Sequence, residues 1–337
     1  MNIKSAWLTT TRSCNCRCEW CYAKKTLGRK SFMDFDKAIL AVDELKKRNV
    51  KKIVLIGGEP TIYNHFLDLV RYIHNNGINC TIATNGIKFS NLDFAKATIN
   101  AGADNINISL KATSEREYKK LTGNGALSDV LLGYKNLRTL GFNPIFSYVI
   151  VNDDNKEFEK LIDLLKKNDI CKIGFQFVKP VLDIKGSEAI MNLKDMANFT
   201  KYIYEYMKEK SPEIQYSLEI SFPLCLIDEK ILTNLINEKK ITTCCHVQRG
   251  NGIVFDTDFK VLPCNHFAEF PFTDKPLDLS KNFSIESLWK SEEVKNFRKR
   301  ARCYPSIQCK SCNYWNICGG GCFTRWLFIN PNDYINK

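Results

Sequence analysis

Three cysteines near the start of the chain, Cys14, Cys18 and Cys21, lie in one short loop with three and then two residues between them. A loop this tight can bind three irons of one iron–sulfur cubane but cannot reach the fourth, so one iron is left without a protein ligand. A structural zinc knuckle would instead use four ligands, with cysteines paired at two-residue spacing. The spacing therefore favours a cubane with one open iron, which is a place for chemistry.

Two further motifs accompany this loop. Trp20 and Tyr22 flank its last cysteine, and the sequence Gly-Gly-Glu-Pro follows an apolar strand at residues Gly57, Gly58, Glu59 and Pro60. Together they resemble the two signature motifs of the radical S-adenosylmethionine (radical SAM) enzymes. The resemblance implies that the open iron chelates SAM, that residues 57–60 hold its methionyl amino group, and that reductive cleavage of SAM gives a 5′-deoxyadenosyl radical that abstracts hydrogen from a C–H bond.

The composition limits where such a chain can work. With 337 residues, of which 44% are hydrophobic, it can form one large domain and a smaller one. No apolar run approaches the roughly 20 residues of a membrane helix, and no secretory signal is present. Fifteen cysteines then indicate metal-binding thiolates, because a reducing cytosol does not maintain disulfides. We expect a cytoplasmic protein without membrane contact.

The net charge is +12, and the basic residues are densest from Lys295 to Arg302. This run lacks the interleaved aromatic residues of a nucleic-acid-binding surface, and a solvated helix face accounts for it. Nucleic acid is therefore not the expected partner, while an acidic substrate segment stays open.

Apolar strands alternate with amphipathic stretches from Ser5 to Phe177, the pattern of a parallel βα sheet. The predicted strands are residues 6–10, 52–56, 79–84, 105–110, 144–151 and 172–177. Apolar residues at helical spacing predict three core-facing helix sides: Phe35, Ile39, Leu40 and Val42; Phe66, Leu69, Val70 and Ile73; Phe158, Leu161, Ile162 and Leu165. Six such units predict an α/β fold that resembles the partial (β/α)6 TIM-like barrel of the radical SAM family.

In barrels of this kind the site lies at the carboxyl ends of the strands. The cysteine loop, the two glycines Gly57 and Gly58, and Asn85 all follow strands there, and glycine lets the backbone approach a ligand closely. Polar residues alternate with apolar ones along the fourth strand and form one face: Asn105, Asn107, Ser109 and Lys111. That polar face inside a barrel needs partners.

The resemblance assigns Ser109 and Lys111 to the ribose and carboxylate of SAM. Many relatives carry Asp-Gly where this chain has Lys111 and Ala112, so the chain departs from the family there. Gln176, on the sixth strand, is a further candidate, and a hydrogen-bonded polar residue of the barrel is its alternative reading.

Nine of the fifteen cysteines lie between Cys225 and the C-terminus. The block from Cys309 to Cys322 has the spacing C-x₂-C-x₅-C-x₃-C, whereas a zinc ribbon would use two pairs at two-residue spacing. The block resembles the core of the SPASM domain, which carries two auxiliary [4Fe–4S] clusters. The segment before Cys264 resembles the hairpin that precedes one auxiliary ligand, with Phe259 where the family usually has glycine. That departure affects the turn.

The same resemblance sorts the remaining cysteines into two auxiliary clusters. Cluster I would be held by Cys225, Cys245, Cys264 and Cys322, with Cys244 as the alternative to Cys245. Cluster II would be held by Cys309, Cys312 and Cys318. No cysteine follows Cys322, so Cys303 is the expected fourth ligand of cluster II, and Asp333 or an open iron is the alternative.

Three cysteines and two histidines have plainer expected roles. Cys16 should point away within its loop, and Cys80 and Cys171 should be small buried residues near strand starts. His246 and His266 flank presumed ligands and should cover their sulfur atoms.

These features predict a radical SAM barrel over residues 1–180, a bridging and substrate-recognition segment over 181–243, and a SPASM domain over 244–337. The expected function is hydrogen abstraction from a ribosomally made peptide, giving a C–C or C–S crosslink or an epimerised residue. The alternatives are a small-molecule substrate, a sulfatase-type protein, RNA, or a non-catalytic electron-transfer role.

The implied cofactors are SAM and three [4Fe–4S] clusters, one that binds SAM and two that are auxiliary. The implied partners are the peptide and a flavodoxin- or ferredoxin-type reductant. Because the chain begins at the first barrel strand, recognition of the peptide is expected at the barrel mouth, in the bridging stretch 181–240 or on a separate leader-binding protein.

Overall fold

The computed structural model describes residues 3–27, 31–180, 191–243, 245–281, 284–302 and 305–335. The chain forms two compact units. The first comprises Met1–Ile145 and Arg249–Lys299, and the second comprises Phe146–Gln248 and Arg300–Lys337. These are units of packing, and the functional division at residues 180 and 243 stays a prediction.

All six predicted strands are present, each within one residue of its predicted bounds. They are β1 (Ser5–Thr11), β2 (Lys52–Gly57), β3 (Asn79–Thr84), β4 (Asn105–Leu110), β5 (Ile145–Ile150) and β6 (Lys172–Phe177). Burial alternates along β4 as predicted, with Ile106, Ile108 and Leu110 buried and the polar residues between them half-buried. The fold class is therefore α/β with parallel strands.

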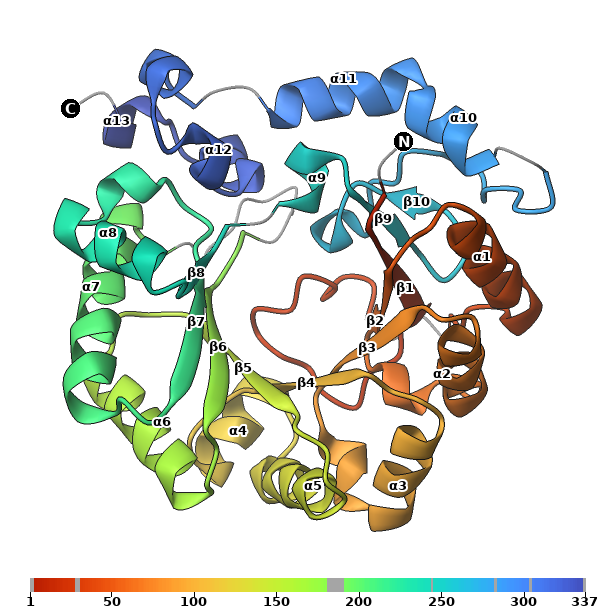
Figure 1. Cartoon of the computed structure of the whole chain (residues 1–337), viewed down its shortest axis with the longest axis horizontal. Helices are drawn as coiled ribbons and strands as arrows, with labels where there is room; N and C mark the ends of the chain where they lie inside the picture. Colours follow the sequence, from red (N-terminus) through yellow and green to blue (C-terminus); the bar gives the residue numbers. More distant parts are fainter. Residues whose placement is uncertain are drawn as a thin grey trace. The chain divides into compact units, whose positions relative to one another are not determined.

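The sheet of the first unit has the order β10-β9-β1-β2-β3-β4. Its β1 to β4 are parallel neighbours (Figure 1). The predicted hairpin is formed by β9 (Gly252–Phe255) and β10 (Val261–Leu262). The sequence did not predict that β9 also pairs in parallel with β1, from Ser5 opposite Gly252 to Leu8 opposite Phe255.

The sheet of the second unit continues beyond the predicted strands. Its parallel order is β5-β6-β7-β8. The strands β7 (Gln215–Glu219) and β8 (Ile241–Thr242) lie inside the segment 181–243, which was expected to bridge two domains and to recognise substrate. Both strands are short, so neither gives a clear pattern in the sequence.

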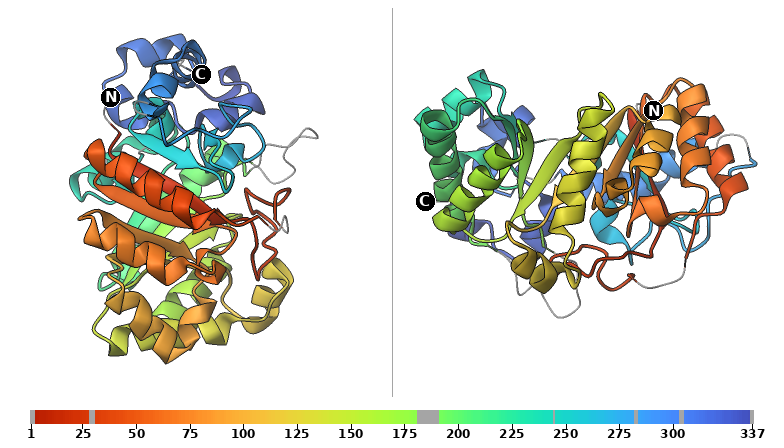
Figure 2. Two further views of the ribbon diagram at one scale, coloured as in Figure 1. Left: turned by 90° about the vertical axis from the view of Figure 1, so that its right-hand side faces the viewer. Right: turned by 90° about the horizontal axis from the view of Figure 1, so that it is seen from below.

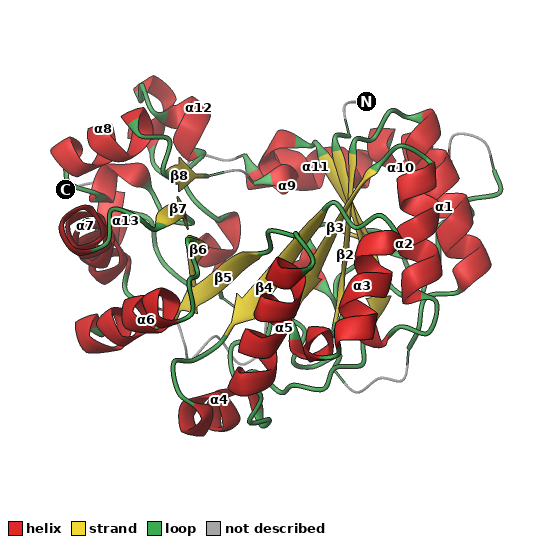
Figure 3. Ribbon diagram, turned by 60° about the horizontal axis from the view of Figure 1, so that its bottom comes forward, coloured by secondary structure: helices red, strands yellow, loops and turns green. Residues whose placement is uncertain are grey.

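Helices cover the strands of each unit. In the first unit α1 (Phe35–Lys47), α2 (Phe66–Asn75) and α3 (Leu92–Asn100) lie along one side of the strands (Figure 1 and Figure 2). In the second unit α6 (Asn155–Lys167) and α7 (Leu193–Lys210) flank β6 (Figure 3), where Phe158 packs against Phe175 and Phe199 with ring centroids 5.4 and 5.9 Å away. The other helical elements complete the chain. The remaining α-helices are α4 (Glu115–Thr122), α5 (Leu127–Thr139), α8 (Glu229–Asn237), α9 (His246–Arg249), α10 (Ser284–Lys290), α11 (Glu292–Ala301), α12 (Trp315–Cys318) and α13 (Asn332–Ile335).

Short 3₁₀ turns are η1 (Pro60–Ile62), η2 (Ile87–Ser90), η3 (Leu224–Leu226), η4 (Asn265–Phe267), η5 (Ile307–Ser311) and η6 (Phe323–Leu327).

The predicted core faces of α2 and α6 are fully buried, but the prediction for α1 was wrong at Leu40, which is 41% exposed. The buried side of α1 instead runs through Ala38, Ala41, Val42 and Leu45. Two of these residues are alanines, which let a helix approach the sheet closely. Alanine is less hydrophobic than leucine, so it contributes less to the apolar periodicity from which a buried helix face is predicted.

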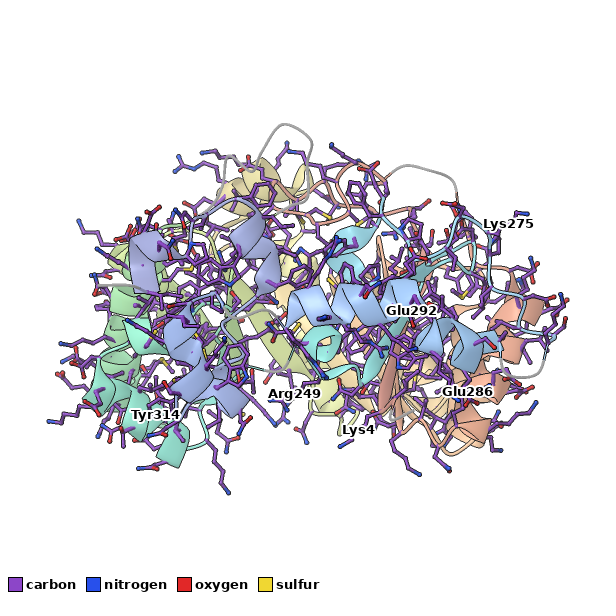
Figure 4. All side chains as sticks on the ribbon, turned by 90° about the horizontal axis from the view of Figure 1, so that it is seen from above. Lys4, Arg249, Lys275, Glu286, Glu292 and Tyr314 are labelled. Atoms are coloured by element: carbon purple, nitrogen blue, oxygen red, sulfur yellow. The ribbon has the colours of Figure 1, made fainter. Side chains whose placement is uncertain are left out.

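The basic run lies at the end of α11 and is largely exposed. Val294 faces the core, while Lys295 is exposed and pairs with Glu292 over 2.9 Å. The guanidinium of Arg298 lies 3.7 Å from the ring centroid of Trp289. Figure 4 shows the side chains of this helix, with Glu292 marking its first residue.

Among the described helices, none has both the length and the apolar character needed to cross a membrane.

Candidate functional site

The cysteine loop (residues 13–22) leaves the carboxyl end of β1 and packs directly on the end of β2. The amide of Gly58 donates to the carbonyl of Thr11 over 2.7 Å, and the amide of Glu59 donates to that of Ser13 over 2.9 Å. A Cβ added to Gly57 would lie 2.3 Å from the oxygen of Thr11, and one added to Gly58 would lie 2.1 Å from that of Ser13. Gly57 is thus needed for contact with the end of β1, and Gly58 for contact with the cysteine loop itself.

The other side of the cysteine loop is held by the end of α4. The amide of Arg17 donates to the carbonyl of Thr122 over 2.6 Å. The Arg17 guanidinium turns back and donates to the carbonyls of Cys14 and Cys16 over 2.6 and 3.0 Å. The loop is therefore fixed between two elements before any ligand binds.

Glu59 connects the ends of β2 and β3 from a fully buried position. Its side chain accepts hydrogen bonds from the amide and hydroxyl of Thr61, at 3.1 and 2.7 Å, and from the Thr84 hydroxyl and the Asn85 amide, both at 2.7 Å. Burial raises the pKa of Glu59, and these hydrogen bonds oppose that shift. The carboxylate is thus engaged within the protein, so it acts as a positioning group for the backbone of residues 57–60. Pro60 is buried at the start of η1.

Asn85 reaches from the end of β3 into the cysteine loop. Its Nδ2 donates to Oδ1 of Asn15 over 2.6 Å and to Sγ of Cys16 over 3.7 Å, while its Oδ1 accepts from the Ile87 amide over 3.1 Å. The sequence placed Asn85 at the carboxyl ends of the strands, and its role as a cofactor-binding residue stays a prediction. In the structure its amide braces the cysteine loop.

The three thiols of the cysteine loop lie within electrostatic range of Lys111. A hydrogen bond to Cys16 lowers the pKa of Cys14, burial opposes the shift, and the charge of Lys111 adds to it. Burial raises the pKa of Cys18 and raises that of Cys21 to about 11, and Lys111 counteracts both shifts. Because β4 alternates, Ser109 lies on the same face of the strand as Lys111.

This arrangement fits three thiolates of an iron–sulfur cubane. The described residues contain no group of three or more His, Cys, Asp or Glu side chains placed to hold one metal ion. Cubane ligands each bind a different iron, so they stand farther apart than the ligands of a single ion. The half-buried thiols, the fixed backbone and the nearby cation Lys111 together suit an anionic cluster.

Tyr22 and His266 connect the cysteine loop with the segment after the hairpin. The Tyr22 hydroxyl donates to the carbonyl of Gly57 over 3.4 Å, and its ring centroid lies 5.3 Å from that of His266. The His266 amide in turn donates to Sγ of Cys264 over 3.3 Å. Trp20, two residues before Tyr22 in the sequence, is half-buried. Cys264, a predicted auxiliary ligand, thus belongs to the first unit, on the side of the cysteine loop.

The hairpin itself is fixed to the start of that loop. Arg12 is 3% exposed and forms a two-point ion pair with Asp256, with nitrogen–oxygen distances of 2.9 and 2.7 Å. The turn that follows places Phe259 at φ 64°, the left-handed region that favours glycine. Its ring is nevertheless buried against Phe255, with centroids 6.4 Å apart. Phe259 thus adopts a backbone conformation that suits the glycine usual in the family, and its predicted effect on the turn stays a prediction.

The cysteines of the second unit form two groups. Partial desolvation raises the pKa of Cys225 to about 11, and the charges of Cys318, Cys309 and Cys312 add to the shift. Burial, followed by the charge of Cys322, raises the pKa of Cys245 to about 11. Cys225 thus lies within electrostatic range of the cysteines assigned to cluster II. Its predicted grouping with Cys245, Cys264 and Cys322 stays a prediction.

Arg325 is buried within electrostatic range of Cys322. Nothing in the sequence indicates a functional role for it, because a single arginine forms no motif. Its side chain is 0% exposed and donates to Ser221 O, Ser221 Oγ and Val178 O over 3.0, 2.8 and 2.6 Å. Burial lowers the pKa of Arg325 to about 10, and the charge of Cys322 opposes the shift. The described residues offer its Nη1 no hydrogen-bond partner.

The other predicted residues have simpler surroundings. Cys80 is buried as expected, but Cys171 is exposed, so its predicted burial was wrong. Cys16, which was predicted only to point away within its loop, is buried. Cys171 stands next to β6. It precedes the first residue of β6, where side chains still face outward. Gln176 is half-buried on β6 of the second unit, and its contact with SAM stays a prediction. Cys244 and Cys303 lie outside the described residues.

Comparison with known proteins identifies the part of the chain that holds this site. Residues 8–165 match the model of the radical SAM superfamily. Two curated relatives are described as probable GTP 3′,8-cyclases. The protein of Saccharolobus solfataricus is 30% identical over 198 residues, which is 58% of this chain and 63% of the relative. The protein of Pyrococcus horikoshii is 31% identical over 150 residues, which is 44% of this chain and 48% of the relative. The chain thus spans less than two thirds of each relative.

Solved structures are similar over nearly the whole chain. SuiB of Streptococcus suis, bound to its precursor peptide SuiA, has a TM-score of 0.73 at 16% identity and is matched over 98% of this chain and 74% of its own. The enzyme anSMEcpe with bound AdoMet has a TM-score of 0.71 at 18% identity, over 95% of this chain and 89% of its own. At these identities the likeness concerns the fold, and it confirms the predicted open α/β barrel class.

Proposed function

We propose that this chain, whose residues 8–165 are a radical SAM enzyme domain, cleaves S-adenosylmethionine reductively and directs the resulting radical to a peptide. The observation that carries the proposal is the immobilised cysteine loop. Its backbone is fixed by the amide of Glu59 on one side and by the carbonyl of Thr122 on the other, and its thiols lie within electrostatic range of Lys111.

The proposal assigns three thiolate ligands and the groups around SAM. A [4Fe–4S] cluster bound by Cys14, Cys18 and Cys21 supplies the electron for cleavage of SAM when it is reduced. Residues 57–60 hold the methionyl amino group through their backbone, since the Glu59 carboxylate is already engaged by Thr84 and Asn85. The positive charge of Lys111 complements the SAM carboxylate, and Ser109 on the same strand face binds the ribose. Trp20 and Tyr22 flank the cluster.

Two auxiliary [4Fe–4S] clusters are the second part of the proposal. Their support is the concentration of cysteines after Cys225 and the two groups that those cysteines form in the second unit. Anaerobically reconstituted protein should then hold about twelve irons per chain, the content of three cubanes. Iron analysis that gives a single cluster would overturn the auxiliary sites and leave the SAM site standing.

A peptide is the proposed substrate because both structural neighbours have been solved with peptides. SuiB is bound to the precursor peptide SuiA, and anSMEcpe to the Kp18Cys peptide, and both are similar to this chain over 95% or more of its length. The proposed outcome is a crosslink or an epimerised residue. A cytoplasmic setting, a flavodoxin- or ferredoxin-type reductant and a separate leader-binding protein complete the proposal.

A nucleotide is the second candidate substrate. The observation that favours it is the 30% identity over 198 residues to a probable GTP 3′,8-cyclase, higher than the identity to either structural neighbour. An RNA substrate has weaker support, since Lys295 of the basic run is paired with Glu292.

Transfer of deuterium distinguishes the two candidates. Reconstituted protein is given dithionite and SAM, with either a deuterated peptide encoded beside the gene or deuterated GTP. The peptide proposal expects deuterium in 5′-deoxyadenosine with the peptide alone. Deuterium transfer from GTP alone would show that the substrate is a nucleotide and not a peptide. Absence of 5′-deoxyadenosine under every condition would contradict radical SAM activity.

A further inference from the structure

Cys225 occupies an exposed position on a rigidly held turn of the second unit. It lies in η3, between Leu224, which is 0% exposed, and Leu226. Leu224 anchors the turn in the core and leaves the neighbouring thiol on its outer side. The Cys225 side chain therefore does not contribute to core packing, and packing does not explain why a cysteine stands at this position.

The segment that carries Cys225 lies along the cysteine block. The Leu224 amide donates to Sγ of Cys318 over 3.4 Å, and the Cys322 amide donates to the carbonyl of Ser221 over 2.9 Å. A Cβ on Gly321 would lie 2.8 Å from Cα of Phe222, so the two backbones are in direct contact. The amide beside Cys225 already makes the N–H···S contact that commonly surrounds a cluster thiolate.

Successive turns hold the other three cysteines together. The Cys312 amide donates to the carbonyl of Cys309 over 3.4 Å, the Trp315 amide to that of Cys312 over 3.0 Å, and the Cys318 amide to that of Tyr314 over 2.7 Å. All three thiols lie within electrostatic range of Cys225. Four thiols from two chain segments thus lie within electrostatic range of one another.

We propose that Cys225 is the fourth ligand of auxiliary cluster II, completing the set of Cys309, Cys312 and Cys318. The inference rests on the proposed auxiliary clusters and replaces Cys303 and Asp333 as the expected fourth ligand. Asp333 is exposed in α13. A cluster with four thiolates has no open iron, so it transfers electrons and does not bind substrate. Substrate contact at an auxiliary iron is then left to the group that contains Cys245 and Cys322.

The test uses the full chain with Cys14, Cys18 and Cys21 replaced by Ala, so that only auxiliary clusters remain. Into this background go Cys225→Ala, the rival Cys303→Ala, and the control Cys171→Ala, which removes another exposed cysteine of the second unit. Iron content and the electron paramagnetic resonance (EPR) spectrum are read in each reconstituted protein, together with far-ultraviolet circular dichroism to verify folding. Cys225→Ser is added as a second variant, because its hydroxyl can replace the thiolate as a ligand.

The background should hold about eight irons per chain. Cys225→Ala should lose up to about four of them or show the signal of a three-iron cluster, and Cys225→Ser should keep iron with an altered spectrum. Cys171→Ala and Cys303→Ala should match the background. A Cys225→Ala protein with unaltered iron and spectrum overturns the ligand assignment alone, whereas a background without iron overturns the auxiliary clusters and this assignment with them.

Discussion

The hydroxyl of Thr84 donates a hydrogen bond to the carboxylate of Glu59 over 2.7 Å and so ties the end of β3 to the end of β2. Asn85, the next residue, donates its amide to the same carboxylate and its side chain to Asn15 in the cysteine loop. One buried carboxylate thereby aligns the three strand ends from which the site is built.

Replacing Glu59 by Gln should weaken this connection. The amide keeps the shape of the side chain but turns one acceptor into a donor, which opposes the N–H of either Asn85 or Thr61. We expect a loss of about 1–3 kcal/mol in the free energy of unfolding and slower SAM cleavage. Urea unfolding measures the first effect, with Glu205→Gln, whose side chain is 56% exposed, as the control. Equal midpoints for the two variants would refute the role of Glu59.

Replacing Cys14, Cys18 and Cys21 together by Ala should abolish formation of 5′-deoxyadenosine. The thiols are half-buried and the loop backbone is held by its own hydrogen bonds, so folding should be retained. Chromatography of the products after reduction with dithionite measures the effect, and circular dichroism checks the fold. If cleavage of SAM persists, the cysteine loop is not the SAM site.

Phe259→Gly sets backbone strain against burial. Glycine relieves a left-handed conformation that costs roughly 1–2 kcal/mol for other residues, but loss of a buried phenyl ring costs roughly 3–5 kcal/mol. Burial wins, and the variant should be destabilised by about 2–3 kcal/mol. Lys239 is also left-handed, at φ 56°, but is exposed, so Lys239→Gly should be neutral or stabilising by up to about 1 kcal/mol. Thermal unfolding of both variants checks the pair, and stabilisation by Phe259→Gly would contradict this balance.

Glu44 should give the first unit an acid-sensitive contribution to stability. Burial opposes its ionisation, but hydrogen bonds from Lys47 and Arg48 prevail and hold the pKa of Glu44 below its ordinary 4.5. A lowered folded-state pKa stabilises the protein above the ordinary value, and this stability is lost as the pH falls through the folded-state pKa.

Glu44→Gln should therefore destabilise the protein at pH 7 by about 1 kcal/mol and have little effect at a pH below the folded-state pKa of Glu44. Urea unfolding at both pH values measures the difference. A constant effect of the substitution across this range would mean that charge at Glu44 is not its cause.

Arg325→Met should expose the cost of removing a buried donor. The acceptors on Ser221 and Val178 lose their hydrogen bonds, which amounts to about 2–4 kcal/mol of unfolding free energy. The matched control is Arg138→Met on the exposed side of α5, which should change stability by less than about 0.5 kcal/mol. Similar values for the two variants would show that the buried guanidinium contributes nothing.

Local patterns predicted the strands β1 to β6 because each is an apolar run flanked by turn residues, and the spacing of Cys14, Cys18 and Cys21 marked the site. What the sequence could not predict are contacts between distant segments. Nothing in Gly252–Phe255 indicates β1 as its neighbour, and nothing in Cys225 indicates Cys318. Leu40, predicted to be buried, is exposed. A sequence pattern gives the periodicity of a helix, but which side of the helix is buried depends on the element that it packs against.

The pairing of β1 with β9 has a consequence for the order in which the protein is made. Arg12 and Asp256, which join these strands, are 244 residues apart. At about 5–20 residues per second, a ribosome needs roughly 12 to 50 s to reach the second after the first. The cysteine loop emerges early, but the strand that completes its support is synthesised much later. Delivery of iron and sulfide to this loop in its final setting is therefore an event that follows most of translation.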